Sequence, residues 1–170
     1  SKYSDLQQNT TIPGGPTGNQ TITVGGATTS DQETVLAVST SGNITLNLNG
    51  NQFRTTAGDV LSTDTDGASI INVATGVTVV GTTGDVINFY GAGTGTLNNR
   101  GTIGNATTGR GVYSGSAEAV TVNNLTGGVI NGNYDISNLN DTINNAGTIV
   151  SNVAGQTLTI SSNVLNNSGT

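Results

Sequence analysis

Three segments of this chain have nearly the same sequence: LNNRGTI at residues 97–103, INNAGTI at 143–149 and LNNSGT at 165–170. A looser copy, VNNLTGGVI at 122–130, is two residues longer. The four copies begin at residues 97, 122, 143 and 165, so they are 25, 21 and 22 residues apart. A repeat of this length that joins an aliphatic residue, a polar turn, a glycine and a second aliphatic residue is typical of a solenoid with stacked coils.

The repeated positions predict how one coil is built. The first aliphatic residue should pack inward, and the Asn pair should turn the corner and stack in amide ladders between coils. The glycine should supply a positive φ, and the second aliphatic residue should return to the core. These structural residues are Leu97, Asn98, Asn99, Gly101, Ile103, Val122, Asn123, Asn124, Gly128, Ile130, Ile143, Asn144, Asn145, Gly147, Ile149, Leu165, Asn166, Asn167 and Gly169.

Short alternating segments indicate β-strands throughout the chain. The clearest is Asn43–Asn49, in which Ile44, Leu46 and Leu48 share one face. Residues 21–24, 77–79, 120–122 and 158–160 follow the same pattern. The best helix candidate is 32–38, but its β-branched residues favour a strand. The pattern predicts an all-β chain.

The spacing of the repeats favours a parallel coil with rungs of about 20–25 residues over a β-sandwich. A sandwich needs no sequence repeat and usually packs around large aromatic rings, whereas only 4% of this chain is aromatic. We expect the coil to span residues 20–170, with its last repeat truncated. Residues 1–19, which contain both prolines, are expected to form an irregular lead-in, cap or linker.

The composition excludes several classes of protein. Charged residues make up 8% of the chain, against about 25% in typical domains. The net charge is −6, and the four cationic residues are too few for a nucleic-acid-binding patch. There is no cysteine, which excludes disulfides and thiolate metal sites. No apolar run approaches the roughly 18 residues of a transmembrane helix, so this chain is not expected to insert into a membrane.

Several stretches resemble known repeats: GRGVY at 109–113, AVTVNN at 119–124, GVING at 128–132 and TLNNRGTIGN at 96–105. They resemble the passenger regions of bacterial autotransporters, over residues 70–170 well and 20–69 weakly. The resemblance implies a right-handed parallel β-helix that is secreted or displayed on a bacterial cell surface. It carries over no catalytic residue. Because the family's outer-membrane barrel is not in this sequence, the chain would be a fragment or a released passenger.

Side chains that could carry chemistry are sparse. The absence of histidine excludes Ser-His-Asp and Cys-His catalysis. Asp64 and Asp66 are the candidates for a glycosidase pair or for a Ca²⁺ loop at Ser62–Gly67. That loop would need an acidic residue where Val73 stands, so an ordinary Asp/Gly turn is favoured. We therefore predict no catalytic residue and no cofactor, with Ca²⁺ as the alternative.

Two arginines, Arg100 and Arg110, are expected to flank the same corner of the coil. A solvated corner is the favoured interpretation of this pair. The alternative is a contact with an anionic glycan.

Three functions remain open, and the first is favoured. A non-catalytic, extracellular adhesive rod would bind glycans, a host surface or neighbouring cells through many weak contacts along its flank. A filament subunit would instead self-associate head to tail, because an open solenoid end exposes unpaired backbone and apolar groups. Lateral self-association of rods would instead produce aggregation of the cells that carry them. A carbohydrate-active β-helix enzyme is the lesser alternative.

Overall fold

The computed structural model contains strands and turns, and no helix occurs among the residues it describes. Within that part of the chain, no helix is therefore long and apolar enough to cross a membrane. The described residues are 2–4, 10–13, 18–25, 28–30, 35–39, 41–50, 52–55, 59–81, 84–105, 110–114, 119–136, 140–151 and 159–170.

The strands are short, as the alternating segments indicate. They are β1 (Lys2–Ser4), β2 (Thr10–Pro13), β3 (Gln20–Gly25), β4 (Thr28–Ser30), β5 (Val35–Val38), β6 (Ile44–Leu48), β7 (Gln52–Thr55), β8 (Leu61–Asp64), β9 (Ser69–Val73), β10 (Thr78–Gly81), β11 (Ile87–Tyr90), β12 (Thr94–Asn99), β13 (Thr102–Asn105), β14 (Arg110–Ser114), β15 (Ala119–Asn124), β16 (Val129–Asn131), β17 (Asn133–Ile136), β18 (Thr142–Asn145), β19 (Thr148–Val150) and β20 (Val164–Asn167).

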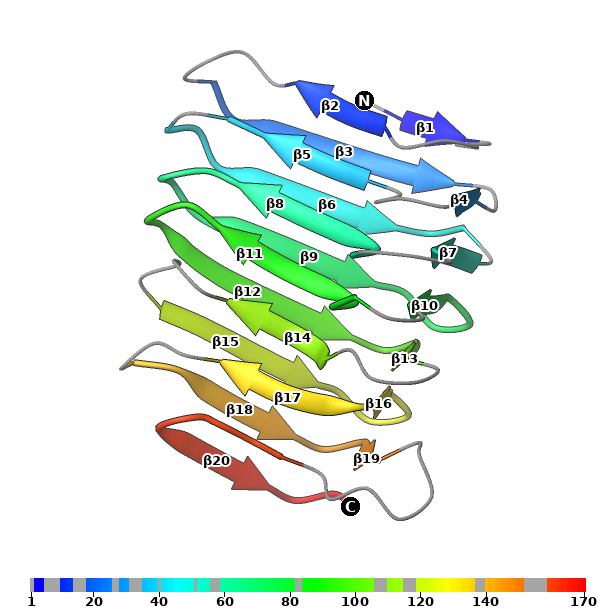
Figure 1. The fold of residues 1–170 in the computed structure, drawn as a ribbon, viewed down its shortest axis with the longest axis vertical. Coiled ribbons are helices and arrows are strands. Elements are labelled where there is room, and N and C mark those ends of the chain that lie inside the picture. The colour runs from blue at the N-terminus through cyan, green and yellow to red at the C-terminus, as the bar shows by residue number, and fades with distance from the viewer. Residues whose placement is uncertain are drawn as a thin grey trace.

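These strands form three sheets, and the strands within each sheet are parallel. Successive coils of the chain stack along one axis (Figure 1). Sheet A has the order β1-β3-β6-β9-β12-β15-β18-β20, sheet B β2-β5-β8-β11-β14-β17, and sheet C β4-β7-β10-β13-β16-β19. Each full coil passes from sheet A to sheet C to sheet B, as in β6-β7-β8. The prediction of an all-β, parallel solenoid is confirmed.

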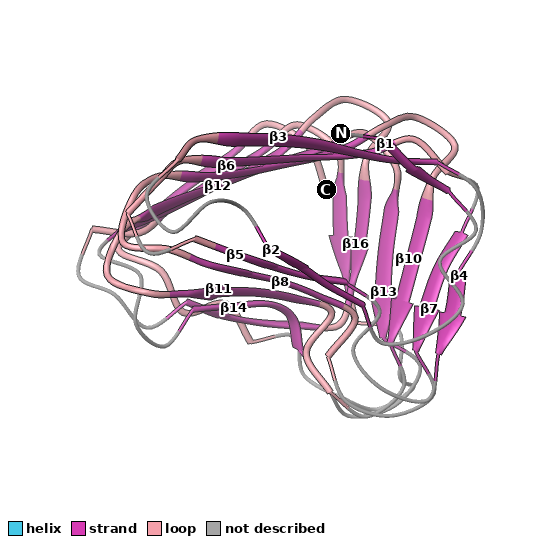
Figure 2. Ribbon diagram, turned by 90° about the horizontal axis from the view of Figure 1, so that it is seen from above, coloured by secondary structure: helices cyan, strands magenta, loops and turns pink. Residues whose placement is uncertain are grey.

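The coil is right-handed. In Figure 2, which looks down the stack from the N-terminal end, the chain passes clockwise from β3 to β4 and then to β5 as it recedes. Nearly all parallel crossovers have this hand, because it lets a right-twisted strand return onto its own sheet. Stacked residues are 21 apart between Asn123 and Asn144 and 26 apart between Asn72 and Asn98, close to the predicted rung length.

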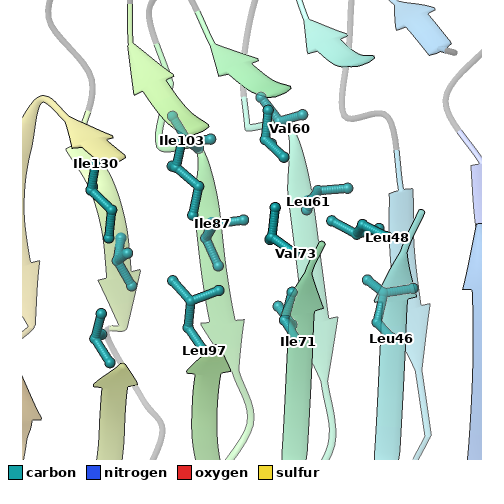
Figure 3. Packing of buried hydrophobic residues seen from close by; sticks show 14 of the residues in the cluster. Leu46, Leu48, Val60, Leu61, Ile71, Val73, Ile87, Leu97, Ile103 and Ile130 are labelled. Atoms are coloured by element: carbon teal, nitrogen blue, oxygen red, sulfur yellow. The ribbon is translucent and has the colours of Figure 1, made fainter. Parts of the chain in front are cut away.

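Aliphatic side chains stack in columns inside the coil. In sheet A, Leu46, Ile71 and Leu97 occupy paired positions on adjacent coils, are fully buried and lie in line in Figure 3. Each such side chain contributes about 1.5–3 kcal/mol when fully buried. The columns are Ile22, Leu46, Ile71, Leu97, Val122 and Ile143 in sheet A, and Phe53, Val79, Ile103, Ile130 and Ile149 in sheet C.

The beginning of the chain differs from the expected irregular lead-in. Strand β1 pairs with β3, and β2 pairs with β5, so strands occur before residue 20. Lys2–Ser4 and Thr10–Pro13 lack aliphatic alternation, and parallel pairing through backbone groups does not require it.

Two other local expectations concern residues 32–38 and 158–160. The helix candidate at 32–38 contains β5, while its first three residues lie outside the described part. The strand expected at 158–160 is not formed by its described residues, Thr159 and Ile160.

Candidate functional site

The repeated Asn pair forms the end of a strand in each coil. Asn98 and Asn99 are the last two residues of β12, and the pairs at 123–124, 144–145 and 166–167 end β15, β18 and β20. The expectation that the pair turns the corner is therefore wrong. The corner is made by the residues that follow, such as Arg100 and Gly101, because the Asn backbone is still needed for parallel pairing.

The first Asn of each pair belongs to an outer ladder on sheet A. Each amide nitrogen donates to the amide oxygen of the preceding coil, from Asn72 to Asn47 at 2.9 Å and from Asn123 to Asn98 at 3.0 Å. The ladder contains Asn47, Asn72, Asn98, Asn123, Asn144 and Asn166. Stacking of identical amides at successive coils satisfies one donor and one acceptor of each interior side chain.

The second Asn belongs to an inner ladder that runs in the opposite direction; Asn99, Asn124 and Asn145 are buried in it, whereas Asn167 is exposed. The Asn99 amide nitrogen donates to the Asn124 side-chain oxygen at 2.9 Å, Asn124 donates to Asn145 at 2.9 Å, and Asn145 donates to Asn167 at 2.8 Å. The Asn124 amide also donates to the Gly128 and Thr148 carbonyl oxygens, both at 3.1 Å. These ladder amides therefore bond the corner backbone as well as one another.

From β12 onward, the inner Asn ladder occupies the position that aliphatic residues occupy in β6 and β9. Leu48 and Val73 occupy the same position on the two preceding coils and are buried. Asn99 pairs with Val73 in register and begins the polar part. The last four strands of sheet A therefore have a hydrogen-bonded position where the two strands before them, β6 and β9, have an apolar one.

The repeated glycines have a different role from the expected one. Gly101, Gly128, Gly147 and Gly169 are not among the positive-φ glycines, which include Gly76 and Gly127 in the longer turns. A Cβ atom on Gly147 would overlap the Gly128 carbonyl oxygen, and one on Gly169 would overlap the Gly147 carbonyl oxygen. Close stacking of backbones, and not dihedral freedom, therefore requires glycine here.

The outward face of sheet A is uncharged from β6 to β18. We call it the Thr/Asn flank; it consists of Thr45, Asn47, Ile70, Asn72, Thr94, Thr96, Asn98, Ala119, Thr121, Asn123, Thr142 and Asn144. Thr45, Ile70, Thr96, Thr121 and Thr142 form one column through the strand register. The Asn ladder forms the next column, so two rows of neutral side chains follow the solenoid axis.

A groove of about 470 Å³ lies where the Thr/Asn flank meets the corner between sheets A and C. It is lined by three consecutive copies of the repeat, Asn123–Leu125, Asn144–Ala146 and Asn166–Ser168, together with Leu165. Ala146 and Ser168 are small and exposed, whereas Leu125 is larger and partly buried. None of the described residues that line the groove is charged.

The two carboxylates proposed for calcium or glycoside chemistry lie at the end of β8. Ser62 and Thr63 are fully buried within that strand, whereas the first residues of a calcium loop surround an ion. Ca²⁺ binding at Asp64 and Asp66 stays a prediction. Asp66 accepts a hydrogen bond from the Ala92 backbone nitrogen at 3.1 Å, so this carboxylate joins two successive coils. No group of three or more His, Cys, Asp or Glu residues that could hold a metal occurs among the described residues.

Charged and aromatic side chains form a network that joins successive coils at the start of the sheet B strands. The sequence analysis did not predict this network. Arg110 makes a bidentate contact with Asp85, with distances of 2.8 Å and 2.9 Å, and its guanidinium lies 3.6 Å from the centre of the Tyr113 ring. The Asp59 side chain accepts hydrogen bonds from the Asp85 backbone nitrogen at 2.9 Å and from the Tyr90 hydroxyl at 3.1 Å.

This network has two consequences. Burial raises the pKa of the Asp59 carboxyl above its usual value of 3.8, and its two hydrogen bonds oppose the shift. Arg100 follows β12, whereas Arg110 begins β14, so the two arginines do not flank the same corner as expected. Arg110 is engaged in an ion pair, which argues against the anionic-glycan contact.

No family model, no curated protein and no solved structure matches this chain.

Proposed function

We propose that the chain is a non-catalytic, extracellular adhesive rod that acts through its Thr/Asn flank. The observation that supports this most directly is the neutral double row of Thr and Asn side chains on sheet A. The whole chain carries a net charge of −6, yet no charge interrupts this face from β6 to β18. Such a surface makes many weak polar contacts that add up when rods are displayed together.

The repeat supports this proposal because it extends the same chemistry from coil to coil. Hydrogen-bonded Asn amides have little freedom left to lose on binding, so each contact has a reduced entropic cost. Stacked coils also form a quasi-one-dimensional rod, in which added repeats add binding surface. Display at a bacterial cell surface is part of the proposal and rests on the resemblance to autotransporter passengers.

Beads coated with residues 1–170 provide a test of adhesion through the flank. The triple variant Thr96→Lys, Thr121→Lys, Thr142→Lys places like charges along the flank and should abolish bead clustering and bead attachment to bacterial cells. A matched variant, Thr78→Lys, Thr102→Lys, Thr148→Lys, changes equally half-buried threonines on the outer face of sheet C and should leave both unchanged. Equal adhesion by the flank variant and the unmodified chain would refute the proposal.

A further inference from the structure

The groove beside the Asn ladder repeats the same lining at three levels. Each coil contributes two Asn residues and one residue of the corner, in the order Asn-Asn-Leu, Asn-Asn-Ala and Asn-Asn-Ser. Coils of a parallel solenoid are separated by about 4.7–4.9 Å, the distance between neighbouring strands. The groove therefore presents equivalent groups at regular steps of this size.

The hydrogen-bonding capacity of the lining is only partly used. The Asn144 amide donates once, to Asn123, and accepts once, from Asn166, in the outer ladder. A primary amide has two N–H donors and two acceptor lone pairs, so one donor and one acceptor of Asn144 remain for a ligand. A group that presents both a donor and an acceptor at each step would match this arrangement.

The shape of the groove follows from the sizes of the corner residues. Arg100, Leu125, Ala146 and Ser168 occupy equivalent positions, since the backbone nitrogen of each donates to the coil before it. The two small residues, Ala146 and Ser168, leave space next to the larger Leu125. The volume of about 470 Å³ lies within the range of roughly 300–1,000 Å³ found for small-ligand sites.

We propose that this groove binds a neutral oligosaccharide, with successive sugar units on successive coils. Sugar hydroxyls donate and accept together, as the free amide groups require, and the Leu125 side chain offers an apolar contact for the C–H face of a ring. The uncharged lining matches a neutral ligand, because an anionic sugar would find no cationic partner among the described lining residues. This inference rests on the proposed adhesive function and assigns it a ligand class and a site.

NMR titration of the ¹⁵N-labelled chain of residues 1–170 tests the site. The probes are cellohexaose, N-acetylchitohexaose and maltohexaose, with hexagalacturonate as the anionic probe. At least one neutral probe should shift the signals of Asn123–Leu125, Asn144–Ala146 and Asn166–Ser168 in a saturable way, including the Asn144 side-chain amide, and hexagalacturonate should not. No saturable shift at these residues with any neutral probe, or an equal response to hexagalacturonate, would overturn the proposal.

Two variants with matched controls locate the site. Ala146→Trp fills the groove from an exposed position and should eliminate the shifts, whereas Thr126→Trp, at an exposed turn position outside the lining, should keep them. Asn144→Leu should weaken binding about tenfold, the effect of losing one or two hydrogen bonds, whereas Asn72→Leu in the same ladder should not. Unchanged binding by Ala146→Trp, with an unchanged far-UV spectrum, would overturn the assignment.

The bead assay separates the failure of this inference from the failure of the proposed function. If Ala146→Trp reduces bead clustering but no neutral probe shifts the groove signals, the groove contacts a second copy of the chain, and the saccharide proposal is wrong while adhesion stands. If the flank variant with three lysines adheres normally, the adhesive function itself is refuted.

Discussion

Asn123 and Asn124 are adjacent in sequence but have different surroundings. Asn123 faces outward and is half-buried, whereas Asn124 is fully buried and donates to one side chain and two backbone carbonyl oxygens. Asn124→Leu removes the donor to the Asn145 side-chain oxygen and the Thr148 carbonyl oxygen and the acceptor of the Asn99 amide. It should lower the free energy of unfolding by about 2–4 kcal/mol, since a buried unsatisfied group costs about 1–3 kcal/mol.

The neighbouring substitution is the control for the inner ladder. Asn123→Leu leaves groups that water can reach and should cost less than about 1 kcal/mol. Urea unfolding followed by circular dichroism compares the two variants. Equal losses would show that the inner ladder is not a buried structural network.

Gly147 and Gly127 differ in what a side chain at each position would meet. In Gly147→Ala the new methyl group would overlap the Gly128 carbonyl oxygen, so the two coils must separate. In Gly127→Ala the methyl group meets no atom within 4 Å, and the cost is the positive φ of 84° alone, about 1–2 kcal/mol. We expect Gly147→Ala to lower the thermal midpoint much more than Gly127→Ala; the reverse order would contradict the stacking explanation.

The raised pKa of Asp59 makes stability depend on pH. The folded protein holds a proton on this carboxyl at pH values where the unfolded chain has already released it. The stability gained from this proton is present at low pH and is lost as the pH rises from 3.8 through the raised pKa. Asp59→Asn removes the titration, so the stability of the unmodified chain should fall relative to the variant as the pH rises through this window.

Urea midpoints of both proteins, measured between acidic and neutral pH, test the sign of this effect. A difference between the two proteins that is independent of pH, or that changes in the opposite direction, would contradict the burial of Asp59.

Residue roles were less predictable than residue positions. The repeat identified the Asn and Gly positions, but it could not show that Asn98 lies on the outer face and Asn99 on the inner face of one strand end. The choice between a glycine that adopts a positive φ and one that avoids an overlap depends on the distance to the preceding coil, which is not a local property of the sequence. The Asp59–Asp85–Arg110 network likewise joins residues that are distant in sequence.

At the scale of the strand, alternation of aliphatic and polar residues was sufficient where one face is buried. Strand β6 shows the pattern fully, with Ile44, Leu46 and Leu48 buried and Thr45 and Asn47 half-buried. Strands β1 and β2 were missed because they pair in parallel without an aliphatic pattern. The sequence therefore indicates a strand through the alternating apolar residues of its buried face, and not through its backbone hydrogen bonds.

A pair of adjacent residues in β19 tests the side-chain alternation of a strand. Ile149 is buried in the sheet C column, and Thr148 is half-buried on the outer face. Ile149→Asn should lower the free energy of unfolding by about 2–5 kcal/mol, as for other losses of a core side chain, whereas Thr148→Ser should change it by less than about 0.5 kcal/mol. Equal thermal midpoints for the two variants would contradict the register of this strand.

At the scale of the whole molecule, the coil converts a short repeat into long surfaces. Parallel register places equivalent residues of successive coils next to one another, so a sequence such as Thr-x-Asn becomes two rows along sheet A. The parallel coil and its rung length were predictable because they follow from the repeat spacing. The groove was not, since it depends on which side chain each copy places at the corner.

We propose that adhesion resides on the flank of the solenoid and not at its ends. Sedimentation and negative-stain electron microscopy of residues 1–170 over a concentration series test it most directly. Single flank contacts are weak and act only when many rods are displayed together, so we predict a monomeric rod at every concentration. Unbranched fibres that lengthen with concentration would show that the ends carry the association, and would contradict adhesion through the flank in favour of a head-to-tail filament.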